Sequence, residues 1–214
     1  MNKIITILIF ITVNASTFAT DQYTDKIIYN GKKYNLQITL LEKFFEKNPE
    51  LKPLDEIQST ALHKGYVASF EIKNNQIFLT DIEVLSKDKD VKEGYPYKFK
   101  SVLNDIFPNS KSIQMVWFTG IVVIPYGKNL NYTSYERELE DDNYFVLEFE
   151  NGNLNKEICL NNENYLAFKK EQYEKFKLTN EYKEVQNKIQ ERLNEVDVDY
   201  GIRQQIIKYL PKIY

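Results

Sequence analysis

The sequence predicts an α+β fold: a largely antiparallel sheet of about six or seven strands, short covering helices and a helical C-terminal tail. Three tight-turn signals each separate two runs rich in β-branched and aromatic residues. One further stretch is apolar on both alternating faces. From residue 161 the apolar period changes from two to about 3.6 residues. We therefore expect a signal peptide at 1–19, a sheet domain at 20–160 and a helical extension at 161–214.

Residues 65–84 predict the central hairpin, with Asn74 and Asn75 in the turn. Side chains alternate along a strand, so one face of this hairpin is apolar and the other is mostly polar. An uninterrupted register gives four cross-strand pairs: Ile72 with Ile77, Phe70 with Leu79, Ala68 with Asp81, and Tyr66 with Glu83.

Two more hairpins are expected, at 26–37 around Asn30-Gly31 and at 143–160 around Asn151-Gly152. In the second, Phe149 should face Leu154, and Phe145 should face Ile158.

Residues 112–124 are expected to form one central strand covered on both faces, which ends at Pro125. Gly120 within it indicates a bulge, a bend or the close approach of another backbone. The polar segments 86–93 and 128–142 are expected to be loops.

Helical spacing predicts helices at 40–48 and 98–107. Thr39 with Glu42 resembles a capping box for the first. In the tail, Asn161 or Asn162 is the expected N-cap. Aromatic and aliphatic residues then recur on one face, with an interruption near Thr179, and a further short helix is expected at 197–214. The stripe includes Tyr165, Phe168, Tyr173, Phe176, Tyr182, Val185, Ile189 and Leu193.

Residues 1–19 have the features of a secretory signal peptide: Lys3, an apolar run at 4–13 and a small-x-small site at 17–19. The run is too short to span a bilayer, so we expect an exported protein, periplasmic or secreted, with no stable membrane span. Cys159 is the only cysteine and cannot form an intramolecular disulfide. It is expected to act as a small hydrophobic residue in a strand.

The formal net charge of −3 argues against a nucleic-acid partner. The sequence contains no glycine-rich phosphate loop, no zinc-ligand spacing and no G-x-S-x-G motif, so we expect no cofactor and no metal. Asp197-x-Asp199-x-Gly201 has Lys208 where a calcium loop has its twelfth-position Glu. These acidic residues are expected at a helix N-terminus instead.

His63, Asp81 and Glu83 are weak catalytic candidates. Asp55, Ser59 and His63 recur at intervals of four, which on a helix would stack them along one face, whereas a hydrolytic triad converges from different elements. Asp81 and Glu83 share a strand face in the simple register, and two carboxylates can perform acid–base chemistry or bind a cation. They can equally mark the point where a strand leaves the core.

An acidic cluster is the candidate partner-binding segment. It has two interpretations, a solvated loop or a patch that attracts a basic partner. Its members are Glu136, Glu138, Glu140, Asp141 and Asp142.

The block from Ser59 to Glu83, followed by Trp-Phe-Thr-Gly at 117–120, resembles a loose set of small exported bacterial proteins. That set carries no established activity, so the resemblance implies export and a similar scaffold, and it assigns no functional residues.

The preferred hypothesis is an exported binding protein without catalysis, such as a periplasmic inhibitor or immunity-type protein that acts on a protein partner. One alternative is a cell-envelope hydrolase that uses the carboxylates or His63. The other is a glycan or small-molecule binding module that uses exposed tyrosines.

Overall fold

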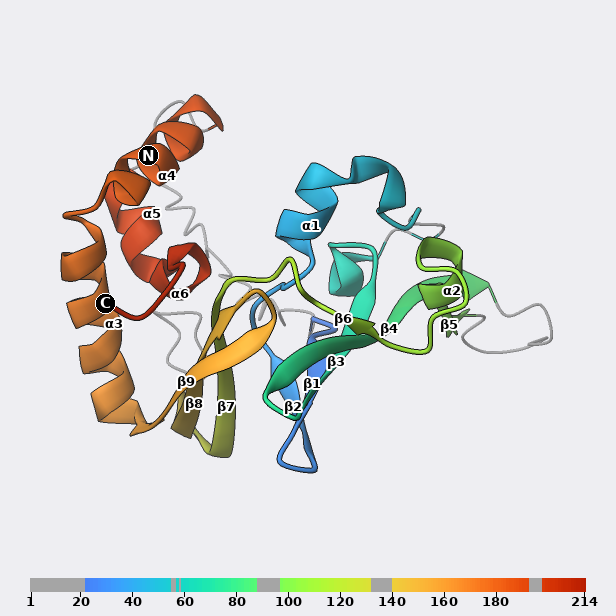
Figure 1. The fold of residues 1–214 in the computed structure, drawn as a ribbon, viewed down its shortest axis with the longest axis horizontal. Coiled ribbons are helices and arrows are strands. Elements are labelled where there is room, and N and C mark those ends of the chain that lie inside the picture. The colour runs from blue at the N-terminus through green and yellow to red at the C-terminus, as the bar shows by residue number, and fades with distance from the viewer. Residues whose placement is uncertain (1–21, 55–56, 58, 88–96, 132–139, 193–197) are drawn as a thin grey trace, which may run out of the picture.

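The computed structural model describes residues 22–54, 57, 59–87, 97–131, 140–192 and 198–214. The predicted signal peptide at 1–19 lies outside these ranges. The α+β class is confirmed: the described residues form a nine-stranded, mostly antiparallel sheet with a helical C-terminal region (Figure 1).

The main path of the sheet runs β2-β1-β3-β4-β9-β8-β7, and β5 and β6 pair with β4. Only β1 and β3 pair in parallel within the described sheet. The strands are β1 (Asp25–Tyr29), β2 (Lys32–Leu36), β3 (Val67–Lys73), β4 (Gln76–Lys87), β5 (Tyr97–Ser101), β6 (Ile113–Gln114), β7 (Gly120–Asn131), β8 (Glu140–Glu150) and β9 (Asn153–Asn161).

All three hairpins are confirmed, and their turn residues adopt the left-handed conformation that such turns require. These residues are Asn30 and Gly31, Asn74 and Asn75, and Asn151 and Gly152.

The central hairpin has the predicted register only near its turn. Phe70 faces Leu79, but Ser69 then faces Asp81, so Thr80 is an extra residue in β4. The Thr80 hydroxyl donates a hydrogen bond to the Ser69 carbonyl at 3.0 Å. The predicted pairs of Asp81 with Ala68 and of Glu83 with Tyr66 are therefore wrong, because a bulge reverses the alternation.

A second register shift lies in the β8–β9 hairpin. Phe149 faces Leu154 as predicted, but Phe145 faces Cys159 instead of Ile158. Cys159 lies in β9, as predicted, but its side chain is exposed, so it does not pack as a buried hydrophobic residue.

The predicted strand at 112–124 is two strands. β6 ends at Gln114, and β7 begins at Gly120, whose φ of +153° accompanies the break. Among the described strands β7 pairs with β8 alone, so it is an edge strand and the predicted central position is wrong. Pro125 does not end β7, because the free edge of the strand needs no hydrogen-bond donor. Coverage of both faces is confirmed: Ile121 and Val123 pack against the tail, and Val122 and Ile124 pack in the main core.

The first helix, α1 (Glu42–Lys47), ends at Asn48 but has Leu41 at its N-cap, without a capping side-chain hydrogen bond. The predicted capping box is therefore wrong. The helix expected at 98–107 is also wrong, because 97–101 form β5 and only α2 (Leu103–Ile106) is helical. Two short 3-10 turns are η1 (Pro49–Leu51) and η2 (Thr60–Leu62).

Both predicted loops are partly strand. Ser86 and Lys87 belong to β4, and the remainder of the first loop, 88–93, lies outside the described residues. In the second, 128–131 and 140–142 extend β7 and β8, while 132–139 are not described.

The tail consists of α3 (Asn162–Phe176), α4 (Asn180–Arg192), α5 (Val198–Gln204) and α6 (Ile206–Tyr209). Asn161 caps α3 as predicted, accepting a hydrogen bond from the Asn164 amide at 2.9 Å. The final helix is broken at Gln205. Asp197 lies outside the described residues, and Asp199 lies in the first turn of α5.

Two apolar cores lie on opposite faces of β7 and β8. The tail helices cover one face, where the rings of Tyr144 and Tyr165 stack 4.0 Å apart. The main core lies between the two halves of the curled sheet and beneath α1 and α2 (Figure 1). The halves are joined by the backbone pair of Gln76 with Asn153 and by the hydrogen bond from the Ile77 amide to the Gly152 carbonyl. The rings of Tyr29 and Tyr34 also contact Phe145 across this junction.

Candidate functional site

The three catalytic candidates do not form a catalytic set. His63 is exposed at the end of η2, while Ser59 caps this turn. Asp81 accepts a hydrogen bond from the Ser101 hydroxyl at 2.6 Å, and Glu83 faces Ser101 across the β4–β5 pair. Within the described chain no hydrogen bond or ion pair joins His63 to either carboxylate. Asp55 lies outside the described residues.

The acidic cluster is only partly described. Glu136 and Glu138 lie outside the described residues, and Glu140 begins β8. Asp142 accepts a hydrogen bond from the Lys128 amide at 3.0 Å. Asp141 is buried, and this burial, together with the charge of Asp142, raises its pKa. The prediction of a solvated loop or patch is therefore wrong for Asp141.

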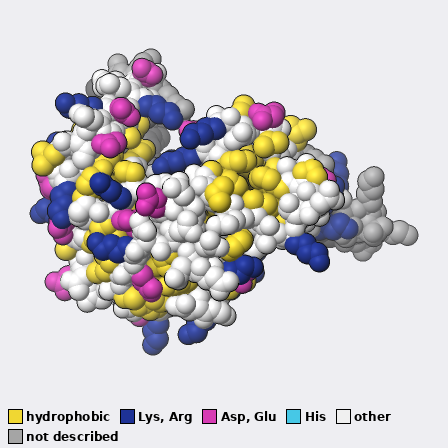
Figure 2. Space-filling model, viewed as in Figure 1, with side chains coloured by type: hydrophobic (Ala, Val, Ile, Leu, Met, Phe, Trp, Pro, Cys, Tyr) yellow, Lys and Arg dark blue, Asp and Glu magenta, His cyan; other side chains and the backbone are white. Residues whose placement is uncertain are grey.

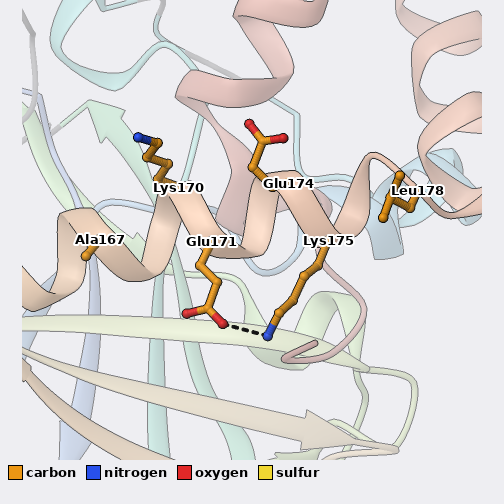
Figure 3. Close-up of a pocket in the computed structure, with 6 residues that line it drawn as sticks. All are labelled: Ala167, Lys170, Glu171, Glu174, Lys175 and Leu178. Atoms are coloured by element: carbon orange, nitrogen blue, oxygen red, sulfur yellow. Dashed lines mark ion pairs between the residues drawn. The ribbon is translucent and has the colours of Figure 1, made fainter.

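A shallow hollow runs along the outer side of α3, and one helix with the residues after it supplies the whole lining (Figure 3). Glu171 and Lys175 form an ion pair across it at 2.7 Å. Catalytic pockets gather groups from several elements, so this surface does not have the form of an active site. Its lining residues are Ala167, Lys170, Glu171, Glu174, Lys175 and Leu178.

The tyrosine stacks of the described chain use their ring faces internally. Tyr126 stacks on Phe145 at 4.2 Å, and Tyr144 stacks on Tyr165. A row of tyrosines lying flat and open to a glycan is therefore not formed by these residues.

A surface cluster of large apolar side chains is the strongest candidate. We define the aromatic patch as Phe44, Phe107, Trp117 and Val116. The Trp117 ring lies 4.7 Å from the Phe44 ring and nearly parallel to the Phe107 ring, at 6.2 Å and 8°. The three rings are half-buried and Val116 is 55% exposed. Figure 2 shows hydrophobic side chains gathered on the face where α1 and α2 lie.

Two hairpins hold the connection that carries Val116 and Trp117. The Met115 amide donates to the Ile77 carbonyl at 3.0 Å, beside the central turn. The Gly152 amide donates to the Phe118 carbonyl at 2.8 Å, and the Asn151 amide donates to the Thr119 hydroxyl at 3.0 Å. Met115 is fully buried between these contacts and anchors the connection, so Val116 turns outward.

Lysines from three helices gather around α1, the helix that supplies Phe44. We define the lysine rim as Lys43, Lys47, Lys188 and Lys208. Lys188 forms an ion pair with Glu46 at 3.2 Å, which places α4 beside α1. Desolvation lowers the pKa of the Lys43 ammonium; the charge of Glu46 opposes this shift, and the charges of Lys208, Lys188 and Lys47 add to it. The rim is thus locally basic on a chain of net charge −3.

The sequence did not single out this site, because Val116 and Trp117 belong to a stretch that was expected to form a strand covered on both faces. One signal was present: a short helix cannot bury both Phe44 and Phe45 on one narrow face. Phe45 is 2% exposed, whereas Phe44 is half-buried and packs against the outside of the main core. No comparable signal marks Val116, because its exposure depends on the break between β6 and β7.

Comparison with protein-family models, with curated proteins and with solved structures gives no match to this chain. No helix in the described part of the chain is long and apolar enough to cross a bilayer. Function is therefore inferred from the arrangement of the site.

Proposed function

We propose that this chain is an exported binding protein without catalytic activity, which holds a protein partner on the aromatic patch. An inhibitor or immunity-type role fits this proposal. The observation that carries it is the convergence of Phe44, Phe107 and Trp117 from three separate segments onto one surface, beside the exposed Val116. Aromatic residues in a partly open cluster are the side chains that most often anchor protein interfaces.

The lysine rim supports a partner with an acidic face. Lys43 and Lys47 lie one turn apart on α1, the helix that also supplies Phe44. Charges at the edge of an interface accelerate association and reject partners of the same sign, while the apolar centre supplies most of the affinity. An acidic partner is thus favoured over the basic partner that the acidic cluster would select.

The test is affinity capture from a cell-envelope extract with matched surface variants. Val116→Asp places a charge beside Trp117 at an exposed position, so we expect folding to be preserved. We expect recovery of the captured protein to fall at least about tenfold, the effect of losing about 1.4 kcal/mol at an interface.

Leu178→Asp is the control, because Leu178 is 89% exposed and lies at the end of α3, outside the patch. It should capture as the wild type does. Equal recovery by both variants, with unchanged circular dichroism spectra, would show that the patch is not the binding surface.

A further inference from the structure

A buried ion pair lies at the start of β1, away from the aromatic patch. The Asp25 side chain is fully buried, and its Oδ1 is paired with the Lys64 ammonium, whose side chain is 16% exposed. The same oxygen accepts a hydrogen bond from the Ala68 amide at 2.6 Å. The other oxygen, Oδ2, is buried and has no hydrogen-bond partner within the described residues.

The ion pair leaves one buried oxygen of Asp25 without a hydrogen bond among the described residues. A buried pair overcomes its desolvation penalty only when further hydrogen bonds satisfy the remaining polar atoms, and Oδ2 has none. Burial, opposed by Lys64, raises the pKa of Asp25, and the negative charge of Glu42 adds to the rise. Burial therefore makes the charged carboxylate less favourable here than it is in water.

The neighbours of Lys64 complete a nearly dry site. The Tyr66 ring, fully buried, lies with its centroid 4.8 Å from the Lys64 Nζ. The Tyr66 hydroxyl donates to Glu42 Oε1 at 2.8 Å, so its polar end is satisfied away from the pair. Condensation of this pair requires one proton to pass from the ammonium to the carboxylate, which leaves a neutral amine beside a neutral acid.

From this geometry we infer that Asp25 and Lys64 condense into an intramolecular amide, a covalent cross-link between β1 and the segment that precedes β3. The Nζ lone pair attacks Cγ of the neutral acid, and a Cγ–Nζ bond forms as the Cγ–Oδ2 bond breaks. Oδ2 leaves as water, carrying the acid proton and one amine proton. No oxidant, reductant or further reactant is consumed.

The product removes every unsatisfied feature of the pair. Two buried charges disappear, and the oxygen that leaves is the one without a hydrogen bond. Oδ1 remains as the amide carbonyl and keeps its bond from the Ala68 amide. The cross-link closes a long loop and fastens β1, which pairs with β3 from Lys26 to Ile28. Such a cross-link restricts the unfolded chain as a disulfide does. This chain has a single cysteine and cannot form an intramolecular disulfide.

The test is the intact mass of the purified full chain under denaturing conditions. Cross-linked protein is lighter than its sequence by about 18 Da, one water. Lys64→Arg keeps a cation beside Asp25 but removes the nucleophilic amine, so it should have the full mass of its own sequence. Asp25→Ala, which lacks the electrophile, should also have full mass.

Tryptic digestion locates the bond. In the cross-linked chain Lys64 is not cleaved, and the peptide ending at Lys26 travels joined to the peptide spanning 48–73. A full intact mass for the wild type, with a free peptide of residues 48–64, overturns the inference. Since Lys64→Arg retains the ion pair, a folded variant is available whichever result is obtained.

Discussion

The exchange of Gly152 for alanine tests how the β8–β9 turn supports the aromatic patch. Gly152 has φ +76°, and a Cβ atom built on it would lie 2.6 Å from the Met115 carbonyl oxygen and 2.9 Å from its carbon. Gly31 is the matched control, because it occupies the same position of an Asn-Gly turn at φ +71° and its Cβ would meet nothing within 4 Å.

Both substitutions place an alanine in the left-handed conformation, and only Gly152→Ala adds a steric overlap. A left-handed alanine costs about 1–2 kcal/mol at either turn. At Gly152 the overlapping atoms are backbone atoms that cannot rotate away, which adds about 1–3 kcal/mol of overpacking. The turn also forms backbone hydrogen bonds to Phe118 at 2.8 Å and Ile77 at 3.0 Å, each worth about 1 kcal/mol if lost. We expect Gly152→Ala to lower the unfolding free energy by about 2–5 kcal/mol and Gly31→Ala by about 1–2 kcal/mol.

Urea denaturation followed by circular dichroism gives both free energies, and Trp117 fluorescence reports the connection that Gly152 contacts. The Gly152 variant should also shift the emission of the folded protein, because Trp117 is two residues from the contact. Equal losses for the two variants, with unchanged emission, would refute the proposed support of the patch by this turn.

Two further predictions concern the tail. Gln172 is 2% exposed, and its side-chain amide donates to the Tyr214 carbonyl at 3.1 Å and accepts from the Tyr214 amide at 2.7 Å. Gln172→Ala should therefore lower the unfolding free energy, measured by urea denaturation, by about 2 kcal/mol. An unchanged free energy would contradict a stabilising role for these two hydrogen bonds. The Tyr182 hydroxyl donates a hydrogen bond to Asp199 Oδ1, and the nearby hydroxyls of Tyr173 and Tyr182 hold the pKa of Asp199 below its ordinary value. The stabilising effect of Asp199 is therefore present above a pH of about 4 and is lost as the pH falls through the lowered pKa. Tyr182→Phe should therefore lose less stability than the wild type between pH 6 and pH 2, and identical pH profiles would contradict the assignment.

The local signals predicted the hairpins because a turn is decided by its own residues. Asn30-Gly31 and Asn151-Gly152 adopt positive φ angles that few other dipeptides tolerate. The bulges could not be predicted in this way. Thr80 is an ordinary strand residue, and only the pairing of both strands reveals it as the extra one. That single residue moves Asp81 and Glu83 together to the face opposite Ile77 and Leu79.

Residues 97–101 show why helix and strand were confused. Phe99, Val102, Leu103 and Ile106 fit a helical face, yet Phe99 pairs with Leu85 across the β4–β5 ladder. Strand preference depends strongly on the partner that a segment finds, and this partner lies outside the segment. The aromatic patch was missed for the same reason, because its exposure is a property of three segments that come together only in the fold.

The patch lies where the sheet is least continuous. β4 and β9 share a single backbone pair, and the connection at 115–119 bonds to Ile77 in β4 and to the turn between β8 and β9. The segment that carries Val116 and Trp117 is therefore also one of the links between the two halves of the sheet. A partner that holds these residues reinforces that link, because a ligand that binds only the folded state stabilises it in proportion to its affinity. Partial exposure of large apolar groups at this joint costs stability in the free chain, which a partner would restore on binding.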